Sequence, residues 1–140
     1  MQHHMKSLKK QQHLEDEAKH HADLIEHAHE FLRSLEELRA EIIVRDETFK
    51  EAKANKDAEK MAIYHQLANE ISQKCLAYGR KLCENPVPYW VDGDLSKEKI
   101  DLARHAYDVI RNKLCSSLNV FDNDLLPNAH TLVRLAEGRV

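Results

Sequence analysis

The stretch LEDEAKHHADLIEHAHEFLRSLEELRAEI, residues 14–42, decides the fold class. Its apolar residues recur at intervals of three and four, which at about 100° per residue places them on one face of an α-helix. The stripe consists of Leu14, Ala18, Ile25, Ala28, Leu32, Leu35 and Ile42. No glycine or proline interrupts residues 1–78. We therefore predict one long helix over residues 7–53, preceded by a flexible N-terminus at residues 1–6.

The composition excludes turn-rich β folds and glycine-rich phosphate loops. The 140 residues include only three glycines and three prolines, whereas a β-sandwich or β-barrel needs a turn residue roughly every 8–12 positions. Hydrophobic residues make up 42% of the chain and charged residues 32%, which is enough for a core inside a heavily solvated exterior. We predict a single all-α domain over residues 7–140, an elongated helical bundle whose long helices have coiled-coil periodicity.

Apolar periodicity predicts three further helices, over residues 57–83, 96–118 and 127–137. Asp57 is the predicted N-cap of the second helix, because its side chain can accept hydrogen bonds from the first free backbone N–H groups. Pro86 and Pro88 separate the second helix from the third, since a proline disfavours helical geometry in the residue before it. A loop around Asn119–Asn123 separates the third helix from the short fourth one.

With these lengths, the second helix cannot pack along the whole apolar face of the first helix. At 1.5 Å per residue the first helix is about 70 Å long and the second about 40 Å long. An antiparallel second helix covers only the C-terminal half of the first, so the apolar residues from Leu14 to Ile25 need another partner. The third helix or a second copy of the chain can supply it. We favour a homodimer, with Leu24 and Ile25 in the contact.

Histidine is the one unusual component, with ten in the chain and seven before residue 30. His20 and His27 each have carboxylates one helical turn away, which predicts raised pKa values. His20, Asp23 and His27 could hold a transition metal weakly; the alternative is a solvated face stabilised by side-chain pairs.

His21 lies within the apolar stripe of the first helix. It is either a core histidine satisfied by one hydrogen bond or a pH-responsive contact. A buried neutral imidazole has a lowered pKa, so protonation would loosen the protein as the pH falls below about 6.5.

The segment PVPYWVDG, residues 86–93, contains the only tryptophan. This connection between two predicted helices is unusually apolar, because it contains Tyr89, Trp90 and Val91. One interpretation is a plug over the open end of the bundle. The other is a partner-binding edge, because Trp and Tyr contribute a large share of interface energy.

Charge and cysteine content limit the partners and the compartment. The formal charge is −3, and residues 1–60 carry 11 basic against 14 acidic residues, so a nucleic acid or an anionic membrane is disfavoured. Three cysteines without a C-x-x-C pair indicate reduced thiols. No run approaches the roughly 18 apolar residues of a membrane span. We expect a cytoplasmic protein, or one secreted by a route without a signal peptide.

Two short fragments suggest further functions. Ala129-His130-Thr131-Leu132 is similar to the start of the histidine phosphotransfer signature, but Val133 and Arg134 stand where that signature has Lys and Gly. Leu114–Leu135 can be drawn as a helix-turn-helix, although its second segment holds one arginine and no lysine.

The function these patterns favour is a non-enzymatic protein–protein interaction module without a cofactor, such as a small adaptor, chaperone or regulatory protein, and we expect it to self-associate. The alternative is a metal- or pH-responsive protein that uses the histidines of the first helix. A phosphocarrier-like or DNA-binding bundle ranks below both.

Overall fold

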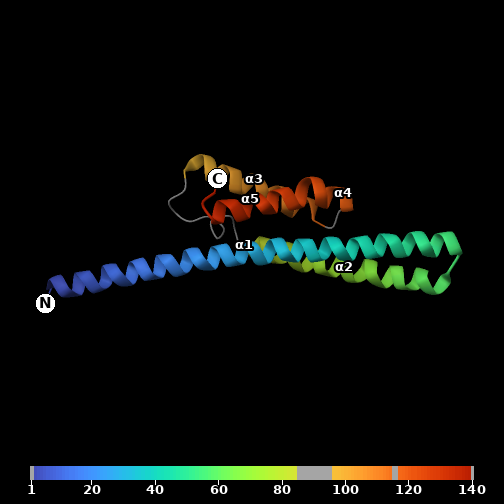
Figure 1. Ribbon diagram of the computed structural model, residues 1–140, viewed down its shortest axis with the longest axis horizontal. Helices are drawn as coiled ribbons and strands as arrows, with labels where there is room; N and C mark the ends of the chain where they lie inside the picture. Colours follow the sequence, from blue (N-terminus) through green and yellow to red (C-terminus); the bar gives the residue numbers. More distant parts are fainter. Residues whose placement is uncertain (1, 85–95, 115–116, 140) are drawn as a thin grey trace.

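The chain folds into a long helical hairpin with shorter helices packed along one side, as the computed structural model shows (Figure 1). The structure describes residues 2–84, 96–114 and 117–139, with the side chains of residues 2–7, 17, 18, 20 and 21 left out. The elements are α1 (Gln2–Asn55), α2 (Ala58–Glu84), α3 (Lys97–Lys113), α4 (Leu118–Val120), the π-helical η2 (Phe121–Leu125) and α5 (Leu126–Ala136). This confirms the all-α bundle.

Helix α1 runs without interruption for 54 residues, which corresponds to about 80 Å. It begins at Gln2, five residues before the expected start, because the first residues include good helix formers and no helix breaker. Its N-terminal part extends beyond the other helices (Figure 1). Charged side chains recur along its length, and no helix in the described ranges has the length and apolar character needed to cross a bilayer.

The turn between α1 and α2 is specified by local hydrogen bonds. Lys56 adopts a positive φ of 49°, and the N–H of Asp57 donates to the carbonyl of Ala52 at 3.0 Å, which is the Schellman arrangement of a helix C-terminus. The Asp57 carboxylate then accepts from the N–H groups of Glu59 and Lys60 at 3.0 and 3.1 Å. The predicted N-cap is confirmed.

The C-terminal third differs from the expectation. Helix α3 ends at Lys113 rather than at residue 118, and a continuous helical run extends from Leu118 to Ala136. The loop predicted at Asn119–Asn123 is therefore wrong. Its Asn and Asp residues are typical of loops, but Phe121 and Leu125 continue the apolar stripe of α5 and are fully buried. Burial of this stripe outweighs the weak local preference.

The π-helical turn accommodates a proline. The N–H of Leu126 donates to the carbonyl of Phe121, five residues earlier. Pro127 follows, and in a regular helix its ring would clash with the carbonyl four residues before it. The wider turn relieves that clash, and the Asn128 side-chain amide donates to the carbonyl of Asp124 at 2.6 Å.

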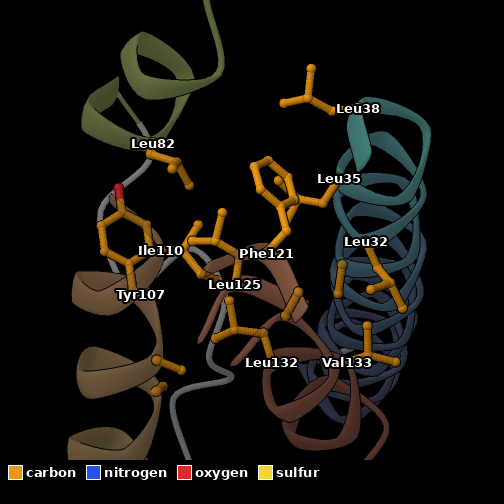
Figure 2. Close-up of a cluster of buried hydrophobic side chains, with 14 of the residues drawn as sticks. Leu32, Leu35, Leu38, Leu82, Tyr107, Ile110, Phe121, Leu125, Leu132 and Val133 are labelled. Carbon is orange, nitrogen blue, oxygen red and sulfur yellow. The ribbon is translucent and has the colours of Figure 1, made fainter. Parts of the chain in front are cut away.

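The core lies where α1, α3 and α5 meet the end of α2 (Figure 2). Its fully buried large side chains include Leu35, Leu38, Leu82, Ile110, Phe121, Leu125 and Leu132. Exposed ion pairs border it: Arg39 Nε donates to Asp122 Oδ1 at 2.5 Å, and this hydrogen bond lowers the pKa of Asp122. Such exposed pairs contribute little stability individually, so apolar burial holds the helices together.

Candidate protein-interaction site

An open groove lies between the C-terminal half of α2 and the end of α3. Its volume is about 500 Å³, and its lining consists of Cys75, Leu76, Gly79, Arg80, Cys83, Glu84, Arg111 and Leu114. Leu76 is 61% exposed. A single exposed leucine on a convex surface needs no explanation, but one inside an apolar concavity marks a surface that a partner can cover.

The spacing of residues on α2 explains the groove. Leu76, Gly79 and Cys83 are three and four residues apart, so they share one helix face. The core face of α2 is a different one, since it carries Ile71 and Leu82. A Cβ atom added to Gly79 would meet nothing within 4 Å. The glycine is therefore not required by close packing, and its missing side chain leaves the floor of the groove open.

The rim of the groove carries two arginines and one glutamate. Arg111 on α3 pairs with Asp108 at 3.4 Å. Arg80 on α2 is exposed and makes no ion pair with any residue that the structure describes. A guanidinium group presents a planar set of donors that matches a carboxylate. Among the described residues that line it, the groove thus combines the apolar side chains of Leu76 and Leu114 with two arginines and one acid, Glu84.

A second, smaller cavity of about 80 Å³ lies between α1 and α2, lined by His27, Glu30, Phe31, Ser34, Tyr78, Lys81 and Leu82. Burial lowers the pKa of His27, Glu30 opposes this shift, and Lys81 adds to it. The carboxylates one helical turn away predicted a raised pKa for His27, and that prediction is wrong. Its face of α1 is partly covered by α2, so desolvation of the imidazole outweighs the neighbouring carboxylates.

Acidification is expected to destabilise the fold through His27. Its pKa in the folded chain lies below the ordinary value of 6.5, so its contribution to stability is complete above pH 6.5 and is lost as the pH falls through the lower folded value. His27→Gln should therefore show a smaller decrease in melting temperature than the wild-type protein between pH 7 and pH 5. The exposed His65 provides a control, because His65→Gln should keep the wild-type decrease. Equal decreases for His27→Gln and the wild-type protein would contradict this role.

One member of the predicted metal set lies outside the described side chains. The His20 and His21 side chains lie outside the description, Asp23 is exposed, and His27 lines the cavity beside α2. Within the part of the chain whose side chains are described, no group of three or more His, Cys, Asp or Glu residues could hold a metal ion.

The predicted partner contacts divide into three groups. Tyr89, Trp90 and Val91 lie outside the described residues. Leu24 is only 3% exposed within the single chain, and Ile25 packs partly buried against the core. These two side chains are thus covered within the single chain. Leu14, at 56% exposure, remains uncovered.

Sequence reasoning missed the groove, although two signals pointed to it. Leu76 lies outside the apolar stripe of α2, and Gly79 is an isolated glycine inside a helical pattern, which often has a packing or functional reason. Nothing in the sequence indicated that Arg111 and Leu114 lie beside them. Comparisons of the chain with protein-family models, with curated proteins and with solved structures gave no match.

Proposed function

We propose that the protein is a non-enzymatic interaction module and that its α2–α3 groove binds an apolar segment of a partner protein. The observation that carries the proposal is the exposed Leu76 on the floor of a groove of about 500 Å³. A partner side chain inserted there would remove apolar surface from water on several sides at once, which makes concave sites effective for binding. The free thiols of Cys75 and Cys83 fit a reducing, cytoplasmic compartment.

The rim defines the chemistry of the partner. Arg80 and Arg111 favour carboxylates near the inserted apolar residue. An amphipathic helix that carries a leucine next to Asp or Glu meets both requirements. Binding of this kind gains specificity from the charged rim and most of its affinity from the apolar floor.

Filling the groove should block binding without harming the fold. Gly79→Leu places a side chain in open space, and removing a glycine from a helix interior should raise stability by about 0.5–1 kcal/mol. Thermal unfolding measures that gain. Partner capture, scored by the proteins that the wild-type chain retains from a lysate of its own cells, should be lost for Gly79→Leu.

Gly79→Ala is the matched control, because it gives a similar helix gain and leaves most of the groove empty. It should retain the wild-type set of partners. Leu76→Glu should lose that set, whereas Ile63→Glu, an exposed position of α2 outside the groove, should not. If Gly79→Leu and Leu76→Glu both retain every partner, the groove is not the binding surface.

A pH-responsive role is the second candidate, and one observation favours it. His27 is half-buried between α1 and α2, and its pKa is lowered chiefly by burial. Protonation would therefore act on the packing between these two helices. The comparison of His27→Gln with the wild-type protein described above tests this role.

A further inference from the structure

We propose that the α2–α3 groove receives the N-terminal part of α1 from a second copy of the same chain. We call residues 2–23 the α1 arm. This inference rests on the proposed function, because it names the occupant of the same groove. Its consequence is a dimer in which each copy inserts its arm into the groove of the other.

The α1 arm has exposed apolar residues and lacks the support that the rest of α1 receives. It extends beyond the other helices (Figure 1), and Leu8 and Leu14 are 52% and 56% exposed. An isolated helical segment of about 20 residues is only marginally stable in water, and most helical stability in proteins comes from packing. A surface that covers Leu14 would therefore stabilise the arm as well as bury apolar area.

The arm and the groove match in chemistry. Leu14 is followed directly by the exposed Glu15, about 100° further around the helix, so a carboxylate borders the face that carries Leu14. The lining of the groove includes Leu76 and Arg80, and Arg80 makes no ion pair with any residue that the structure describes. In one contact, Leu14 would bury apolar surface against Leu76, and the Glu15 carboxylate would pair with the Arg80 guanidinium.

The same chain cannot make this contact. Leu14 lies 13 residues before His27, a separation of about 20 Å along an uninterrupted helix. His27 and Lys81 line the same cavity, and α2 runs antiparallel to α1, so Leu76 lies still farther from the arm. Only another copy can place Leu14 in the groove. Reciprocal insertion uses both arms and both grooves, which gives a closed dimer.

Sedimentation of the full chain at micromolar concentration tests the inference. The wild-type protein should sediment as a dimer, twice 16.3 kDa. Leu14→Glu and Leu76→Glu should each raise the dimer dissociation constant by about tenfold or more. Both positions are exposed in the single chain, so their melting curves in the monomeric range should match the wild-type curve. Ile63→Glu is the control and should remain dimeric.

A charge exchange tests the pairing itself. Arg80→Glu and Glu15→Arg should each weaken the dimer, and the two substitutions together in one chain should restore it, because opposite charges would again face each other in both contacts. A monomer at every concentration, or a dimer unaffected by Leu14→Glu and Leu76→Glu, would overturn the self-association. That result would leave groove binding to other proteins intact, since Gly79→Leu against Gly79→Ala decides the proposed function separately.

Discussion

Replacing Phe121 by alanine is expected to lower the free energy of unfolding by about 3–5 kcal/mol, the range of large aromatic truncations in protein cores. The ring is 0% exposed and lies in the centre of the cluster formed by α1, α3 and α5 (Figure 2). Its removal would leave a cavity that helices on several sides cannot close without losing other contacts. Denaturant unfolding of the purified variant at neutral pH measures the loss.

The size of that loss also decides between a helix and a loop at residues 119–123. In a solvated loop, truncation of Phe121 would cost less than about 1 kcal/mol, as surface substitutions usually do. Leu126→Ala is the matched control, because Leu126 belongs to the same helical run but is only partly buried. It should cost clearly less than Phe121→Ala. Similar small losses for both variants would contradict the burial of the η2 segment.

Leu35→Ala is expected to cost about 2–5 kcal/mol for the same physical reason. Leu35 is fully buried on α1, and its side chain is directed into the cluster that contains Phe121 (Figure 2). Because the two residues share one core, the double variant should cost measurably less or more than the two single losses added together. Denaturant unfolding of the four proteins gives this coupling energy.

Leu102, which is 37% exposed on α3, provides the reference for the Leu35 variant. Leu102→Ala should cost little, and its effect should add to that of Leu35→Ala, because it lies outside the core cluster. A Leu35→Ala loss no larger than that of Leu102→Ala would mean that α1 does not pack on the C-terminal helices as described.

The features that the sequence predicted correctly depend on residues close together in the chain. The absence of glycine and proline before residue 79 favours long helices in that part of the chain. Asp57 caps α2 through N–H groups two and three residues away. The third helix was expected to begin at residue 96, and there the Ser96 hydroxyl accepts from the N–H of Lys99. Each of the two capping signals can be read within about five residues.

The features that the sequence did not predict depend on how distant segments pack. The helix at Asn119–Asn123 forms because Phe121 is buried against other elements, which local Asn and Asp preferences do not reveal. Arg39 and Asp122 are 83 residues apart. The pKa of His27 depends on where α2 lies, since α2 decides which face of α1 meets water. The groove likewise requires the C-terminal ends of α2 and α3 to lie near each other.

The order in which the helices are synthesised determines how long the nascent chain exposes apolar surface. Helix α5 is the last of the described helices, yet it packs on α1, and His29 meets Glu137 across 108 residues of sequence at 2.5 Å. At about 5–20 residues per second, a ribosome needs about 4–16 s to make the roughly 80 residues between the end of α1 and the end of α5. Until α5 has been made, the part of the α1 stripe that packs on α5 lacks this cover. Protection against aggregation is therefore needed most during translation, before the last helix closes the core.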